Sequence, residues 1–258
     1  MSLAACGEKV RRGDPDRFLS AMTAPPGLRA RLLVLYAFNL ELARAPLVAN
    51  EATIAEMRLQ FWADTIADMN TGQPPRAHEV AAPLADLVRE TGLDNAVLSE
   101  MVTARRFDLY REPHRDLAAF ERYIDRTSGH LMWLAARSLG ASPELESDIR
   151  DFAWGAGVAA LLRAVPDLQA LGRAPLIDAT PGGIIALADL ALGKMNRARR
   201  AQRHMPKALL PALLAGWRAG STLHTARRDP GAVARGGLEE SPFRRKFALL
   251  WRDMLGRW

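Results

Sequence analysis

The stretch that decides the fold reads Leu33-Val34-Leu35-Tyr36-Ala37-Phe38-Asn39-Leu40-Glu41-Leu42-Ala43-Arg44. It predicts the middle of a long helix, because apolar residues recur every three or four positions, at Leu28, Leu32, Leu35, Phe38 and Leu42. A helix that is apolar around most of its circumference is typical of the centre of a core. Asn39 and Glu41 fall where burial is expected, so each needs a hydrogen-bonding partner.

The rest of the chain also favours helices. Asp14-Pro15-Asp16 is a helix N-terminal signal, with a capping aspartate followed by proline. Periodicity, caps and breakers predict helices over about 14–22, 28–46, 51–70, 80–90, 95–110, 116–139, 142–165, 184–204, 207–227 and 243–255. Pro46 and Pro166 are expected to end two of them. No alternating run of β-branched residues predicts a strand, so the fold class is all-α.

Length and breakers predict one large unit with two extensions. We expect an N-terminal tail over residues 1–13, a helical domain over 14–228, and a flexible basic C-terminal segment with a final helix over 229–258. The single cysteine, Cys6, excludes an internal disulfide framework and a cysteine-based zinc site. A reducing, cytoplasmic compartment is consistent with it.

Charge is unevenly distributed along the chain. Residues 1–189 hold 20 Lys/Arg against 25 Asp/Glu, whereas residues 190–258 hold 15 against 4. Such asymmetry predicts an anionic partner, with a solvated basic surface as the equal alternative. The expected membrane or partner surface consists of Lys194, Arg197, Arg199, Arg200, Arg203 and Lys207. Nucleic acid is disfavoured, because no binding motif accompanies the basic residues.

No apolar run approaches the ~20 residues that span a bilayer. The start, Met1 to Gly7, resembles a lipoprotein cleavage box but lacks the basic and apolar regions of a leader. We therefore expect a cytoplasmic protein, with peripheral contact at the inner membrane as an option.

Common enzyme motifs are absent from the sequence. It contains no P-loop, no glycine-rich dinucleotide fingerprint and no His-Glu-x-x-His, and its five histidines are scattered. The run Arg105-Arg106-Phe107-Asp108 is interpreted as ion pairs on a helix face. No metal site of this chain's own is predicted from these residues.

Several segments fall in the order seen in one enzyme family. They include Leu35-Tyr36-Ala37-Phe38, Met57 to Trp62, Pro74-Pro75 with His78 and Val80, Asp108-Leu109, Tyr123 to Gly129 and Gly155 to Arg163. Over about residues 14–180 the chain resembles the squalene/phytoene synthases, which are head-to-head prenyltransferases. The resemblance implies an isoprenoid-synthase-like helical bundle around a central cavity.

The family's chemistry requires two aspartate-rich motifs that hold Mg²⁺ against a diphosphate leaving group, since Mg²⁺ prefers oxygen ligands. At the matching positions this chain departs from the pattern. Leu40 replaces an arginine, and the aspartate positions are occupied by Ala43, Arg44, Leu47, Ala164 and Leu168. The resemblance therefore implies that both metal motifs are lost, and no cofactor is expected. Glu41 and Asp167 are poor substitutes.

Some cavity residues of the family are retained. Tyr36, Tyr123 and Arg163 match residues that line its cavity. We expect Arg163 to pair with Glu41 or Asp108, assisted by Asn39, because a buried guanidinium needs a carboxylate. A cavity that still binds an isoprenoid or other lipid is the alternative.

The wording Ala-Phe-Asn-x-Glu-Leu-Ala resembles a degenerate branch of the family that includes a mitochondrial factor for respiratory complex I assembly. The first hypothesis is thus a non-catalytic protein that binds a lipid or a respiratory-complex subunit. The alternative is an active, Mg²⁺-dependent prenyltransferase acting on farnesyl or geranylgeranyl diphosphate.

Overall fold

The structure, a computed structural model, describes residues 3–48, 52–110 and 112–258, with the side chains of 47 and 48 left out. Its α-helices are α1 (Leu3–Gly13), α2 (Pro15–Met22), α3 (Pro26–Val48), α4 (Ala52–Asn70), α5 (Ala81–Thr91), α6 (Asn95–Arg105), α7 (Leu117–Ile124), α8 (His130–Ser138), α9 (Glu146–Ala170), α10 (Pro181–Arg200), α11 (Leu210–Leu213), α12 (Ala219–Arg228), α13 (Gly231–Ala234) and α14 (Pro242–Leu255). Short turns η1 (Arg106–Leu109), η2 (Asp125–Gly129), η3 (Pro143–Leu145), η4 (Ala201–His204), η5 (Lys207–Leu209) and η6 (Leu214–Gly216) join them. The described ranges contain no strand, so the predicted all-α class is confirmed.

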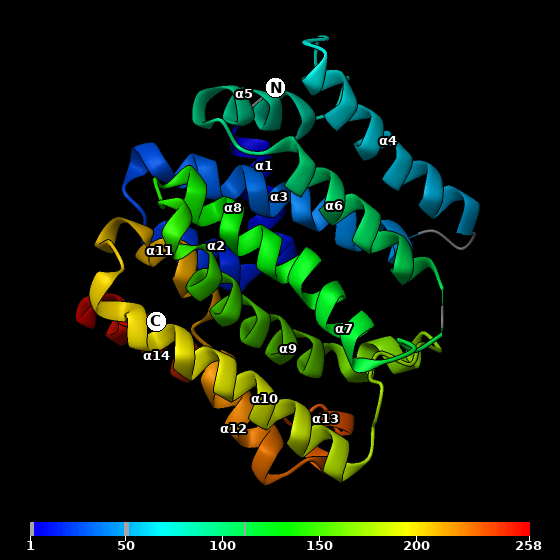
Figure 1. The fold of residues 1–258 in the computed structure, drawn as a ribbon, viewed down its shortest axis with the longest axis vertical. Coiled ribbons are helices and arrows are strands. Elements are labelled where there is room, and N and C mark those ends of the chain that lie inside the picture. The colour runs from blue at the N-terminus through cyan, green and yellow to red at the C-terminus, as the bar shows by residue number, and fades with distance from the viewer. Residues whose placement is uncertain (1–2, 49–51, 111) are drawn as a thin grey trace.

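Helix α3 lies at the centre of one half of the molecule, as its sequence predicted. Its apolar residues Leu32, Leu35 and Phe38 have no exposed surface. Helices α1, α4, α5 and α8 pack around it (Figure 1). The helix is covered on several sides because its apolar residues occupy most of its circumference.

Helix α9 organises the other half, between α8 and α10 (Figure 1). Two glycines allow neighbours to approach its backbone closely. A Cβ atom on Gly155 would lie 2.3 Å from Cγ of Met195 in α10, and one on Gly157 would lie 2.6 Å from Cβ of Ser128 in η2. Larger residues at these positions would force the helices apart.

The segment predicted as one helix over 116–139 contains a π-helical turn. Asp116 caps its start by accepting from the Ala119 backbone N–H at 2.7 Å, as expected. The π turn, η2, separates α7 from α8. Such turns are rare within helices and recur at functional sites. Here the turn brings Thr127 and Ser128 to the wall of a cavity.

Two predicted helix ends are wrong. Pro46 lies inside α3 and Pro166 inside α9. Each falls within the last turns of its helix, where few hydrogen bonds remain to be lost. The carbonyl of Pro46 accepts from Arg173 at 3.0 Å, which ties this end of α3 to the loop after α9. Glu51, the predicted start of the next helix, lies outside the described residues.

The helix predicted over 207–227 is instead a series of short turns, η5, α11 and η6, followed by α12. Gly216 in η6 sits against α9, where a Cβ atom would lie 2.8 Å from Cε1 of Phe152. The chain is bent so that this close contact with α9 can form.

The expected N-terminal tail is not a tail, because residues 3–13 form α1 against α3. Cys6 and Val10 are fully buried one turn apart. Lys9 forms ion pairs with Glu41 of α3 and, at 2.6 Å, with Glu79. Two apolar residues at i and i+4 within a charged sequence were too weak a signal to predict this helix.

The C-terminal segment is also packed against the body of the protein rather than loose. Val233, Leu238 and Trp258 are buried, and Trp258 packs edge-on against Phe152 with ring centroids 4.4 Å apart. The predicted final helix is present as α14. Among the helices described, none has the length and hydropathy to cross a membrane.

Candidate functional site

A cavity of about 290 Å³ opens between α3, η1, η2 and α9, and it is called the large cavity here because it is the larger of two adjoining cavities. Its walls combine apolar side chains with Asn39, Asp108 and Tyr123, three residues that the sequence singled out. Its size lies at the lower end of small-molecule pockets, roughly 300–1,000 Å³. The bundle thus encloses a cavity where the resemblance implied one.

Four residues that the resemblance set against the family's motifs line this cavity from two helices. Leu40 and Ala43 line it from α3, and Ala164 and Leu168 line it from α9. None of these four side chains can bind a cation. Arg44 is exposed and does not line the cavity. The side chain of Leu47 lies outside the described residues.

The carboxylates in the wall of the large cavity are Asp14, Asp108 and Glu112. Asp108 accepts from the Tyr123 hydroxyl at 2.8 Å and from Arg105 at 3.0 Å. Asp14 caps α2 by accepting from the Arg17 backbone N–H at 3.0 Å, and it pairs with the Arg17 guanidinium at 2.5 Å. Two of the three carboxylates are therefore occupied by bonds within the protein. No cluster of three or more metal-binding side chains occurs in the described part of the chain.

Burial shapes the protonation of the Asp108 cluster. Burial raises the pKa of the Tyr123 hydroxyl well above its usual value, and the neighbouring Asp108 carboxylate raises it further. Tyr123 therefore remains a neutral donor at physiological pH. Burial also lowers the pKa of His114, another residue of this wall, so its imidazole is neutral.

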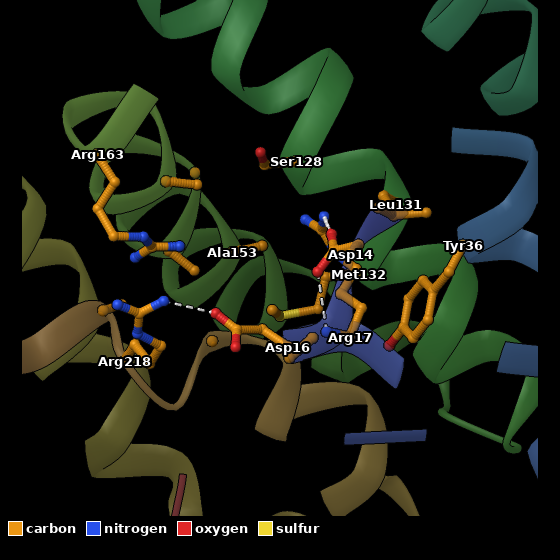
Figure 2. A pocket seen from close by; sticks show the side chains of 16 residues that line it. Asp14, Asp16, Arg17, Tyr36, Ser128, Leu131, Met132, Ala153, Arg163 and Arg218 are labelled. Carbon is orange, nitrogen blue, oxygen red and sulfur yellow. Dashed lines mark hydrogen bonds and ion pairs between the residues drawn. The ribbon is translucent and has the colours of Figure 1, made fainter. Parts of the chain in front are cut away.

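A second cavity of about 90 Å³, the small cavity, adjoins the large one and shares Asp14, Arg17, Ser128, Gly157 and Ala160 with it. Figure 2 shows that its polar residues come from elements distant in the sequence: Tyr36 lies on α3, Arg163 lies on α9, and Arg218 lies just before α12. The Arg17 guanidinium lies over the Tyr36 ring, 5.8 Å from its centroid. Burial raises the pKa of Tyr36 to about 12.

Ion pairs around Asp16 connect the two ends of the sequence at the small cavity (Figure 2). Asp16 accepts from Arg218 at 2.7 Å and also pairs with Arg245 of α14. Arg218 pairs in addition with Glu239 at 2.8 Å. Although burial opposes ionisation of Asp16, hydrogen bonds from Arg218 and Arg245 lower its pKa below the usual value.

The predicted pairing of Arg163 is wrong. Its guanidinium donates to the Thr222 hydroxyl at 3.3 Å and lies 3.7 Å from Glu239. Burial lowers the pKa of Arg163, and the nearby Arg218 lowers it further. Glu41 faces away from both cavities, toward Lys9 and toward His78 at 3.8 Å.

The predicted basic surface is only partly free. Lys194 lies 3.6 Å from Glu121, Arg197 pairs with Asp151 at 3.1 Å, and Arg199 donates to the Trp258 carbonyl at 3.1 Å. These three cations stabilise contacts within the protein. The other three predicted residues, Arg200, Arg203 and Lys207, are exposed.

Sequence reasoning missed several residues of the site. Arg17 and Ser128 line both cavities, and Arg218 is the main partner of Asp16. Asp14 and Asp16 were interpreted only as helix-start signals. Nothing in the local sequence of Arg218 indicates a partner some two hundred positions away.

Comparisons with known proteins agree with this geometry. The sequence profile of the family described as "Squalene/phytoene synthase" matches residues 10–176. The fold is similar to a crystal structure of a dehydrosqualene synthase in complex with ligand, with a TM-score of 0.83 at 16% identity over 98% of this chain and 95% of that one. It is also similar to squalene synthase HpnC from Alicyclobacillus acidocaldarius, with a TM-score of 0.76 at 15% identity over 88% and 93% of the two chains.

The curated relatives of this chain are named as assembly factors, whereas the similar solved structures are named as synthases. The chain is 31% identical over 163 residues to "NADH dehydrogenase (ubiquinone) complex I, assembly factor 6" of Homo sapiens, covering 62% of this chain and 48% of that protein. It is 30% identical over 182 residues to the Drosophila melanogaster homologue, covering 67% and 53%. The chain thus spans about half the length of the curated relatives it matches.

Proposed function

Because the chain belongs to the squalene/phytoene synthase family, we propose that it is a non-catalytic member that acts as an assembly factor for a respiratory complex. Two independent lines support the proposal. One is the chemistry of the large cavity. The other is the name shared by its curated relatives in vertebrates and Drosophila melanogaster.

The observation that carries the proposal is that α3 and α9 line the large cavity without any carboxylate. Ionising an allylic diphosphate needs a metal cluster to neutralise the leaving group, and Mg²⁺ needs oxygen ligands. Ala43 on α3 and Ala164 and Leu168 on α9 supply none. Asp108 cannot take their place without giving up its bonds to Arg105 and Tyr123. Among the described residues that line the cavity from α3 and α9, none offers Mg²⁺ a carboxylate.

A prenyltransferase is the competing function, and the geometry disfavours it. Its support is the cavity itself, which retains Tyr123 and adjoins Arg163. Each of these two groups is engaged within the protein, Tyr123 with Asp108 and Arg163 with Thr222. A cavity of about 290 Å³ whose walls are apolar on the α9 side and include polar groups elsewhere suits a small lipid with a polar group as a bound ligand, and we include such a ligand in the proposal.

Complementation in cells tests the assembly role. Cells that lack the chain are expected to lose assembled NADH dehydrogenase on native gels, and the wild-type chain should restore it. A variant that fills the large cavity, Ala164→Trp, separates the two parts of the proposal. If it restores assembly, the outer surface is sufficient; if it folds but fails, the cavity must hold a ligand. Unchanged assembly in cells without the chain would contradict the proposed function.

A further inference from the structure

Helix α14 exposes a continuous apolar stripe to solvent. The exposed fraction is 78% for Phe243, 72% for Met254 and 54% for Trp251. The members of the stripe are Phe243, Phe247, Leu250, Trp251, Met254 and Leu255. Their spacing places them on one side of the helix, because residues three and four apart share a face. So many large exposed apolar side chains in one patch mark an interaction surface.

The opposite face of α14 fixes the helix to the protein. Leu249 is buried against Leu214 and Trp217. It lies two residues beyond Phe247 and thus about 200° around the helix from it. Arg245 on the same inner side pairs with Asp16, and the Gly256 carbonyl accepts from Gln202 at 3.1 Å. The stripe therefore faces solvent from a helix that its other side anchors to the protein; Figure 1 locates α14 in the fold.

The aromatic rings of the stripe are already aligned. Phe243 and Phe247 are nearly parallel, with centroids 6.2 Å apart and planes 14° apart. Phe247 and Trp251 continue the row at 6.3 Å and 13°. The three rings thus form one row along the exposed side of α14.

Free cations accompany the stripe. Arg244, Lys246 and Arg257 are exposed, and they form no ion pair with any described residue. The Gln202 contact brings η4 beside the end of α14, and η4 carries the exposed Arg203. The one acidic residue of α14, Asp253, is partly buried. The surface around the stripe therefore favours a polyanionic partner.

We propose that α14 is a membrane-docking helix, whose stripe enters the headgroup region of an anionic phospholipid bilayer while Arg244, Lys246 and Arg257 contact lipid phosphates. An apolar row of Phe, Trp and Leu flanked by Arg and Lys is the pattern of helices that lie in a bilayer interface. An acidic protein groove would meet the cations but would need a matching apolar trough. A lipid surface offers both the negative charge and the apolar depth. The proposal is independent of the assembly role.

Trp251 provides a direct readout. Of the six tryptophans, Trp62, Trp133, Trp154, Trp217 and Trp258 are at most 7% exposed, whereas Trp251 is 54% exposed. Mixing the full chain with phosphatidylcholine vesicles containing phosphatidylglycerol should shift its fluorescence to the blue and protect it from iodide. Trp251→Phe keeps the stripe apolar and should bind while losing both signals. Pure phosphatidylcholine vesicles should give neither signal.

Co-sedimentation with the same vesicles measures how much the cations and the apolar stripe each contribute to membrane partitioning. Arg244→Gln with Lys246→Gln should lower partitioning by about 30-fold, at about fivefold per cation. Phe247→Ser should lower it at least tenfold, since an aromatic side chain leaves the bilayer. The matched control is Met57→Ser with Arg58→Gln, which removes one exposed apolar residue and one exposed cation from α4. It should leave partitioning unchanged.

Three results would overturn the proposal. One is the absence of a blue shift on anionic vesicles at low salt. Another is an equal loss of partitioning in the α4 control. The third is self-association of the chain that Phe247→Ser abolishes without any vesicle binding, which would assign the stripe to a protein contact. Binding that weakens at high salt is expected, because salt screens the exposed cations.

Discussion

Replacing Arg218 by methionine should destabilise the protein more than removing any exposed cation. The Arg218 side chain is 6% exposed and its partner Asp16 is 15% exposed, with the two charges 2.7 Å apart. Removing one member of a buried pair typically costs about 3–5 kcal/mol, because the other charge remains buried. Two features reduce that cost here. Asp16 retains Arg245, and Arg163 loses a neighbouring like charge.

We therefore expect Arg218→Met to lower the free energy of unfolding by about 2–3 kcal/mol. For a chain of this size that corresponds to a decrease in melting temperature of about 5–10 °C. Urea unfolding followed by circular dichroism gives the first quantity, and calorimetry gives the second. Asp16→Asn combined with Arg218→Met should cost less than the sum of the two single variants, because the uncompensated charge is absent.

The matched control is Arg89→Met, which breaks a pair with Asp86 in which the side chains are 76% and 65% exposed. Exposed pairs are worth about 0–1 kcal/mol, so this variant should be close to wild type. If the two arginine variants were equally stable, or if the double variant were additive, the reasoning about the Asp16 cluster would be refuted.

Three further outcomes follow from individual residues. Burial raises the pKa of Cys6 to about 11, so Ellman's reagent should modify this single thiol slowly in the native protein and rapidly in urea; rapid native labelling would contradict the packing of α1. Because the pKa of Asp16 is lowered in the folded protein, its ionised carboxylate contributes stability above about pH 4, and this contribution is lost as the pH falls through the folded-state pKa. The difference in unfolding free energy between wild type and Asp16→Asn should therefore be full at about pH 6 and shrink in acid; a difference independent of pH would count against the ion pairs. Gly157→Ala should lower the free energy of unfolding in urea by about 1–3 kcal/mol, because the new methyl group would lie 2.6 Å from Ser128. Gly27→Ala is the control and should be near neutral, because Gly27 has open space around it; equal effects of the two variants would argue against the tight contact between α9 and η2.

Local signals were sufficient for much of the helical framework. The periodicity of α3 predicted its burial, and the caps at Asp14 and Asp116 form the expected hydrogen bonds. These predictions succeed because the interactions join residues three or four positions apart. The α1 helix was not predicted, because its two buried residues, Cys6 and Val10, give too short an apolar pattern.

Long-range partners could not be predicted in the same way. Arg163 was expected to pair with Glu41 or Asp108, but its guanidinium lies beside Thr222 and Glu239 instead. Lys194 and Arg197 were expected to face an external partner, but Glu121 and Asp151 neutralise them. The sequence shows only that basic residues are concentrated in this part of the chain. Which of them remain free depends on how α9 and α10 pack, and no local pattern encodes that.

The family resemblance was more informative about the cavity than any local sequence pattern. The sequence could identify Ala43, Ala164 and Leu168 as replacements for carboxylates only through the family resemblance. The structure places all three on the wall of one cavity, on the helices α3 and α9. That juxtaposition gives the proposed loss of catalysis a physical basis.

The most direct test of this central claim is turnover. The purified full chain, incubated with Mg²⁺ and either farnesyl or geranylgeranyl diphosphate, should release no pyrophosphate above a protein-free blank, because the described residues of the chain include no cluster of three or more metal-binding side chains. A catalytically active squalene synthase assayed in parallel shows that the substrates and detection work. Pyrophosphate release that requires Mg²⁺ and disappears in Asp108→Asn would contradict the account.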